Sequence, residues 1–137
     1  MSTYLLIDTS TSRTSVAIVG DGKTLFASYH DGALSHGEAL PELVAQGLKL
    51  ESRIDQVIVG MGPGPFTGLR AGISFAQSFA LGRGISWQGV CSLDAIASQI
   101  SKSDFIVAVD ARRKEVFYAR YTDGSRIGEP KVCQPSQ

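Results

Sequence analysis

The sequence predicts an α/β protein in which helices pack on a mixed β-sheet. Three observations predict this class. The chain opens with three strand-like segments joined by turns, and it then alternates between segments of helical period and short strand-like runs. Hydrophobic residues make up 43% of its 137 residues, enough for the core of one domain or of one domain plus part of a second.

The opening segment reads as strand, turn, strand, hairpin, strand. Residues 4–8 (YLLID) form a continuous apolar run, which is typical of a central strand buried on both faces. Residues 14–19 and 24–29 are rich in strand-forming side chains. Between them, Asp21 and Gly22 favour a tight hairpin turn because both residue types tolerate positive φ.

A change of period predicts the first helix over residues 36–50. Ser35 is a candidate N-cap, and Pro41 lies near the first turns, where a proline costs least. The apolar residues that recur at helical spacing are Leu40, Leu43, Val44 and Leu48.

The middle of the chain predicts a strand over residues 56–60, followed by the glycine-rich segment GMGPGPFTGLRAG. A helix is expected from this segment to about Leu81, with Thr67 as a possible cap. A short strand over residues 88–91 and a helix over 92–100, capped by Ser92, complete this part.

Strands are expected at residues 105–110 and 116–121, and the polar, proline-containing chain after Asp123-Gly124 is expected to fray. This order fits the ribonuclease-H-like half of an actin-like fold. We therefore expect one such domain over residues 1–102 and the start of a second, truncated lobe over 103–137.

Charge and cysteine content bound the function classes. Thirteen basic and thirteen acidic residues give a formal net charge of +0, so overall charge will not attract nucleic acid or membrane. Cys91 and Cys133 match no metal-ligand spacing and are read as reduced thiols. The chain shows no signal peptide or long apolar stretch, so a cytoplasmic protein without a membrane segment is expected.

The glycine-rich loop is one candidate binding site. Gly62 and Gly64 precede a helix, and free backbone N–H groups at a helix start suit a phosphate. The alternative is a tight turn whose glycines allow close packing, since the spacing matches neither the P-loop nor the Rossmann pattern.

Asp8 ends a buried strand beside the hydroxyls of Thr9 and Ser10, and Asp110 ends a strand in a similar context. In actin-like ATPases such aspartates face Mg²⁺ and the nucleotide phosphates. The alternative is that an aspartate at a strand end binds the amides of its own turn.

No catalytic residues and no metal ligands are predicted. His30 and His36 lie six residues apart across a loop and cannot form a same-face helical metal pair. The sequence holds no recognisable nucleophile and base set. The cluster of Arg112, Arg113 and Lys114 is read as a solvated hairpin tip.

The helix after the loop carries a stripe of small residues, surrounded by more apolar side chains than one sheet-facing surface needs. The sequence therefore predicts a helix–helix interface with a partner, with the packing of this chain's own elements as the alternative. The predicted interface residues are Leu40, Leu43, Val44, Leu69, Gly72, Ile73, Ala76 and Ala80.

Four segments resemble the TsaB (YeaZ) family in order and spacing: IDTSTSRTSVAIV, SHGEALPELV, GPGPFTGLRAG and VDARRKEVFYARY. The resemblance runs to about Tyr121. It implies an actin-like (ASKHA) fold and a non-catalytic role as partner of TsaD, joined by the ATPase TsaE, in attaching threonylcarbamoyl to adenosine in tRNA.

The resemblance also implies that the helical surface pairs with TsaD, or with a second copy in the isolated subunit. A nucleotide, ATP or ADP, is implied only within the TsaB–TsaD–TsaE complex, and tRNA contact is indirect. TsaD carries a His-x-x-x-His metal pair on a helix, whereas His36 here is followed four residues later by Leu40. An actin-like small-molecule kinase and a metalloprotease-like (glycoprotease) relative stay open as alternatives.

Overall fold

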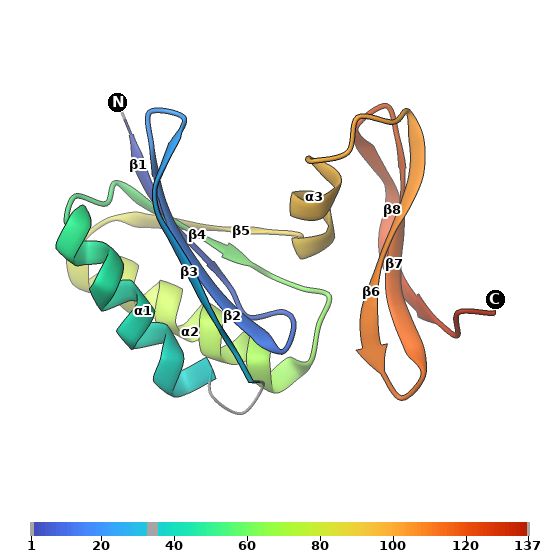
Figure 1. Ribbon diagram of the computed structural model, residues 1–137, viewed down its shortest axis with the longest axis horizontal. Helices are drawn as coiled ribbons and strands as arrows, with labels where there is room; N and C mark the ends of the chain where they lie inside the picture. The colour runs from blue at the N-terminus through green and yellow to red at the C-terminus, as the bar shows by residue number, and fades with distance from the viewer. Residues whose placement is uncertain (1, 33–35, 137) are drawn as a thin grey trace.

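The computed structural model describes residues 2–32 and 36–136, which form a five-stranded sheet and a three-stranded sheet side by side (Figure 1). In chain order, the elements are β1 (Thr3–Asp8), β2 (Arg13–Gly20), β3 (Lys23–Asp31), α1 (His36–Leu50), β4 (Gln56–Gly60), α2 (Phe66–Arg83), β5 (Ser86–Val90), α3 (Ser92–Ala97), β6 (Asp104–Arg112), β7 (Glu115–Thr122) and β8 (Ser125–Cys133).

The five-stranded sheet is mixed, as the sequence predicts, with the strand order β3-β2-β1-β4-β5. Strands β1, β2 and β3 are antiparallel, and the hairpin turn at Asp21 and Gly22 has φ angles of 52° and 74°. Strands β1, β4 and β5 are parallel because α1 and α2 provide the crossovers between them.

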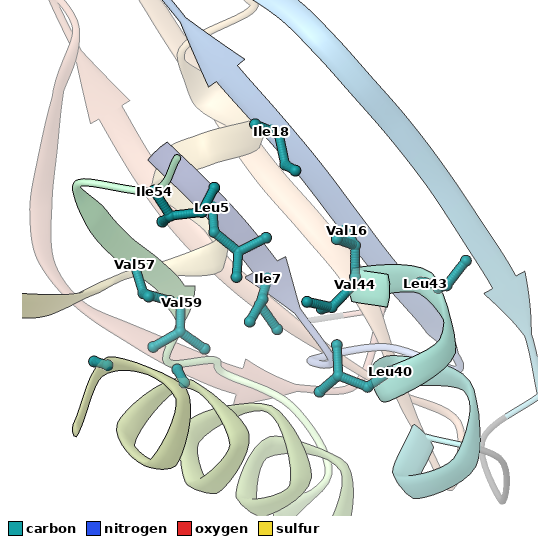
Figure 2. Packing of buried hydrophobic residues seen from close by; sticks show 12 residues of the cluster. Leu5, Ile7, Val16, Ile18, Leu40, Leu43, Val44, Ile54, Val57 and Val59 are labelled. Atoms are coloured by element: carbon teal, nitrogen blue, oxygen red, sulfur yellow. The ribbon is translucent and has the colours of Figure 1, made fainter. Parts of the chain in front are cut away.

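The main core lies between this sheet and the two long helices, which cover the same face (Figure 1). Figure 2 shows Leu5 and Ile7 of β1 and Val59 of β4 directed toward the helices, with Leu40 and Val44 of α1 facing them. The apolar stripe predicted for α1 is therefore confirmed as a core face.

The other face of the sheet is less covered. Burial alternates along β1, so Leu6 is only half-buried, and Ile58 of β4 is half-buried as well. The prediction that the first strand is buried on both faces is wrong for this chain, because α1 and α2 both lie on one side. An apolar groove of about 560 Å³ runs over the open face.

The three-stranded sheet is antiparallel, and α3 packs against it. The sequence-based division at residue 102 placed α3 with the first unit, but its core partners lie in the second sheet. The buried residues they share are Leu93, Ala97, Val107, Ala119 and Tyr121.

Three further expectations are corrected near the chain end and at the helix starts. The segment after Asp123-Gly124 does not fray but forms β8, because the free edge of β7 pairs with its backbone. Helix α2 begins at Phe66 after Pro65, without a side-chain cap from Thr67. Ser92 is the first residue of α3 and not its cap, and Ser35 lies outside the described residues.

None of the helices in residues 2–32 and 36–136 combines the length and the hydropathy needed to cross a lipid bilayer.

Candidate functional site

The turn after β1 binds its own polar groups. The carboxylate Oδ1 of Asp8 accepts a hydrogen bond from the backbone N–H of Ser10 at 2.7 Å. Thr9 is fully buried, and its hydroxyl donates to the carbonyl oxygen of Gly68 at 2.5 Å. Of the two interpretations of Asp8, the structure therefore favours the aspartate that binds the amide of its own turn.

The glycine-rich loop packs directly on this turn. A Cβ added to Gly64 would collide with the carbonyl oxygen of Ser10. A Cβ on Gly60 would lie 2.7 Å from the hydroxyl oxygen of Ser92 and 2.9 Å from the carboxyl carbon of Asp8. Gly64 is needed because its backbone touches that of Ser10, and Gly60 is needed because the side chains of Ser92 and Asp8 fill the space beside it. The Cα of Gly64 is thus packed against the backbone of the Ser10 turn.

A small cleft remains beside the turn, between the first sheet and α3. Its volume is about 150 Å³, whereas small-molecule sites usually measure roughly 300–1,000 Å³. The residues that line it include Asp8, Ser10 and Pro63 on one side and Leu93, Ile96 and Val109 on the other. This cleft is therefore smaller than most small-molecule sites.

Asp110 does not join this cleft. Its neighbour Val109 lines the cleft, and side chains alternate between the two faces of a strand, so the carboxylate of Asp110 points to the opposite face of β6. It is solvent-exposed. The two aspartates expected in equivalent positions are not brought together.

His36 is a buried structural residue. It is 5% exposed, and its Nδ1 lies 2.6 Å from the hydroxyl oxygen of Thr14 in β2. His30 lies on the exposed part of β3. Within the described residues, no three His, Cys, Asp or Glu side chains are grouped as a metal site requires. Cys91 and Cys133 are both free thiols.

Most of the predicted interface residues are covered by the chain itself. Ala76 and Ala80 are 0% and 1% exposed and belong to the main core. A Cβ on Gly72 would collide with the hydroxyl oxygen of Thr9, so the stripe of small residues lets α2 lie close to this chain's own sheet and turn. Leu40, Leu43 and Val44 are buried in the same core.

The stripe is therefore corrected from a partner contact to a core contact. Only Leu69 and Ile73 of the predicted set stay half-exposed.

The outer side of α2 presents a different set of residues. Phe66 is 74% exposed and Leu81 is 84% exposed, although both are large and apolar. The guanidinium of Arg70 lies 5.4 Å from the centre of the Phe66 ring. We call the exposed line along this helix the α2 ridge; it consists of Phe66, Arg70, Ser74, Gln77 and Leu81.

Phe66 was missed because the helix was expected to begin near Gly68. The excess of apolar residues on this helix was the signal that could have found it.

Comparison with known proteins places these features in a family. A family model described as TsaD: tRNA N6-adenosine threonylcarbamoyltransferase matches residues 32–134. The tRNA threonylcarbamoyladenosine biosynthesis protein TsaB of Escherichia coli is 34% identical over 125 residues, which cover 85% of this chain and 54% of that protein. The chain belongs to the TsaB (YeaZ) family. An uncharacterized protein of Mycobacterium tuberculosis is 43% identical over 140 residues, which cover 96% of this chain and 65% of that protein.

Solved structures agree with this assignment. YeaZ from Pseudomonas aeruginosa superposes with a TM-score of 0.84 at 28% identity, covering 98% of this chain and 68% of that one. The ethanolamine utilization protein EutJ from Carboxydothermus hydrogenoformans matches with a TM-score of 0.67 at 16% identity, over 98% of this chain and 52% of that one, and shows the actin-like fold alone. The chain thus spans roughly half to two thirds of the length of these relatives.

Proposed function

We propose that this chain acts as the non-catalytic partner subunit in the synthesis of N6-threonylcarbamoyladenosine in tRNA. The TsaB relatives from Escherichia coli and Haemophilus influenzae carry names from this biosynthesis, and the chain belongs to their family. The observation that supports the non-catalytic role is the packing of the glycine-rich loop on the Thr9–Ser10 turn, where Gly64 meets the backbone of Ser10 and the Asp8 carboxylate accepts from the Ser10 N–H.

In this proposal the chemistry belongs to TsaD. ATP or ADP binds within the complex of this chain with TsaD and TsaE, and tRNA reaches this chain only through the complex. The cleft of about 150 Å³ beside the turn is small, and the groove of about 560 Å³ that Asp8 also lines is mostly apolar, so both support weak or absent nucleotide binding by the chain alone. Calorimetry with ATP and Mg²⁺ should therefore give no measurable heat of binding, and micromolar affinity would contradict this part of the proposal.

The partner surface is the α2 ridge, with Leu69 and Ile73 beside it. Exposed aromatic and aliphatic side chains of this size are typical anchors of protein interfaces, and a few of them usually carry most of the binding energy. The cation–π contact with Arg70 limits the freedom of the Phe66 ring before binding, which reduces the entropy lost on association.

The test is binding of the chain to TsaD, measured by light scattering and calorimetry. Phe66→Ala should weaken the complex at least tenfold, because an interface anchor is worth more than about 1.4 kcal/mol. Ile127→Ala is the matched control, since Ile127 is 57% exposed but lies on β8 of the other sheet. Equal affinity of both variants for TsaD would place the interface elsewhere. If the unchanged chain forms no complex with TsaD, the proposed role itself is contradicted.

Transfer of threonylcarbamoyl to tRNA gives the second readout. The isolated chain should show none, and TsaD with TsaE should gain activity when the chain is added. Transfer by the chain in the absence of TsaD would overturn the assignment as a non-catalytic subunit.

A further inference from the structure

The α2 ridge carries a single charged residue, Arg70, and its other members are neutral. The next charge along α2 is Arg83 in the last turn, and the first turn of the helix has no acidic residue. The exposed carboxylates of Glu38 and Glu42 belong to α1 and lie outside the ridge. The ridge is therefore a line of apolar and neutral side chains with one guanidinium near its N-terminal end.

Arg70 lacks a counter-charge in the folded chain. No salt bridge within residues 2–32 and 36–136 includes its guanidinium. Its neighbours one helical turn away are Phe66, Thr67, Ile73 and Ser74, and none of them has a carboxylate. The contact that the structure gives Arg70 is the one with the Phe66 ring, 5.4 Å from its centre. This positive charge is therefore compensated by water while the ridge is exposed.

Burial of the ridge in a complex changes the energy of this charge. A charge that is removed from water and left unpaired destabilises a complex, whereas a carboxylate across the interface compensates it. Arginine suits such a contact because its planar fork binds both oxygens of a carboxylate. The contact with Phe66 places the guanidinium beside an interface anchor, where water is excluded on binding. A partner that covers Phe66 therefore has to supply a carboxylate to Arg70.

A second copy of the chain does not supply this carboxylate from its own ridge. In a symmetric antiparallel pair of α2 helices, the N-terminal end of one ridge lies along the C-terminal end of the other. Phe66 then lies opposite Leu81, and Arg70 lies opposite the neutral amide of Gln77. In a parallel pair, Arg70 lies opposite Arg70, and the two like charges repel. Pairing of two ridges thus joins apolar residues but leaves Arg70 without a counter-charge.

We propose that TsaD presents an acidic side chain to Arg70, and that this ion pair makes the chain select TsaD over a second copy of itself. The inference rests on the proposed partner surface and names the chemistry of the partner at one point of it. Phe66 and Leu81 then contribute affinity for either partner, and Arg70 discriminates between them. Specificity of this kind comes from a penalty against the wrong partner as well as from attraction to the right one.

Calorimetry with TsaD tests the ion pair. Arg70→Gln keeps a long polar side chain without the charge and should weaken the complex by about tenfold or more. Arg70→Glu should weaken it further, because two carboxylates then meet. Arg83→Gln is the matched control, since this guanidinium donates to the carbonyl oxygen of Ser52 at 2.6 Å and lies over the Phe79 ring. Equal affinity of Arg70→Gln and Arg83→Gln for TsaD would overturn the ion pair.

Salt dependence separates the charge of Arg70 from its ring contact, because Arg70→Gln removes both. The affinity of the unchanged chain for TsaD should fall as salt is added, and the affinity of Arg70→Gln should fall less. Phe66→Ala should weaken binding but keep the salt dependence of the unchanged chain. Full affinity of Phe66→Ala would contradict the proposed surface itself. Weak binding by Phe66→Ala together with normal binding by Arg70→Gln would contradict this inference alone.

Exchange of charges identifies the residue of the partner. Single Asp→Lys and Glu→Lys variants of TsaD are screened for binding to the Arg70→Glu chain. One of them should restore binding to Arg70→Glu and should bind the unchanged chain poorly, since the two positions interact directly. Failure of every such variant to restore binding would overturn the pairing of Arg70 with a carboxylate of TsaD.

A carboxylate introduced into the ridge tests the selection between partners. Gln77→Glu places an acidic group opposite Arg70 in an antiparallel pair of copies, so self-association measured by sedimentation should tighten by about tenfold. The gain should vanish when Gln77→Glu is combined with Arg70→Gln. Ser78→Glu is the control, because Ser78 is exposed on the same helix but lies outside the ridge. No gain for Gln77→Glu, or an equal gain for Ser78→Glu, would overturn the selection by charge.

Discussion

The chain has two bodies, the five-stranded sheet with α1 and α2 and the three-stranded sheet with α3, and different interactions stabilise each of them. The five-stranded sheet lies under two long helices and shares with them a core of twelve buried apolar residues. The three-stranded sheet has one short helix, a buried cluster of five residues and the hydrogen bonds that Tyr121 and Arg126 donate to Asp94. The first body is thus stabilised mainly by apolar packing, and the second depends more on a few hydrogen bonds. Local stability follows the density of buried contacts, so we expect the second body to open first.

The largest effect is expected in the main core. Leu5→Ala removes a side chain that is 0% exposed, and a cavity of this kind costs about 2–5 kcal/mol. Val107→Ala in the second cluster removes fewer buried atoms and should cost less. Urea unfolding, monitored by hydrogen exchange, measures the loss of stability in each of the two variants. Equal losses spread over all elements would show that the two bodies unfold as one unit.

Overpacking beneath α2 should have the next largest effect. Ala76→Leu inserts three carbon atoms into the main core and should lower the free energy of unfolding by about 1–3 kcal/mol. Gln77→Leu is the control, because it places the same side chain on the exposed side of the same helix. Thermal melting compares them. A normal melting temperature for Ala76→Leu together with lost TsaD binding would restore the stripe as a partner contact.

Loss of the hydrogen bond between Tyr121 and Asp94 should have a smaller, local effect. Tyr121→Phe keeps the ring stacked on Phe105 but removes the hydrogen bond to Asp94, which is worth roughly 0.5–1.5 kcal/mol. Hydrogen exchange should rise in α3 and β7 and stay unchanged in β1. A uniform rise in both bodies would contradict the separation between them.

The smallest effect concerns acid stability at the edge of the first body. The backbone N–H of Thr3 donates to Asp55 at 2.7 Å and holds the pKa of this carboxyl below its usual value, and Arg53 lowers that pKa further. The folded pKa lies below the unfolded value of about 3.9. The charge of Asp55 therefore makes its full contribution to the free energy of unfolding above that pH. It is lost as the pH falls through the folded pKa.

Melting temperatures of the unchanged chain and of Asp55→Asn test this dependence. The unchanged chain should be slightly more stable near pH 7, and the difference in melting temperature should shrink as the pH falls below about 3.9 and through the lower folded pKa. A gap independent of pH would show that the charge of Asp55 is not the cause.

Much of the fold could be predicted because the deciding signals are local. Residues 36–50 and 56–60 have the predicted boundaries, and the Asp21-Gly22 turn forms where the residue types allow positive φ. Strand β8 could not be predicted in the same way. Its residues lack a clear apolar alternation, and it is held by the free edge of β7, which exists only once β6 and β7 have paired.

The candidate site was predicted in part. Asp8, the Thr9–Ser10 turn and the glycine-rich loop do lie together, as the ends of neighbouring parallel strands should. Whether the turn and the loop leave room for a ligand or pack against each other depends on distances of a few ångströms, which residue types do not reveal. The backbone of Gly64 approaches that of Ser10 closely, as the alternative of a tightly packed turn requires.

The amino-acid sequence alone determined the mixed sheet, the helix that buries Leu40 and Val44, the resemblance to the TsaB family and the need for close backbone approach at the glycines. These features follow from residue type and spacing along the chain. Only the tertiary structure decided which face of α2 is covered, which sheet holds α3 and what occupies the space around Asp8. The reason is that burial depends on which segments meet in space: the same small stripe serves a partner helix or the chain's own sheet equally well, and Ala76 meets the sheet.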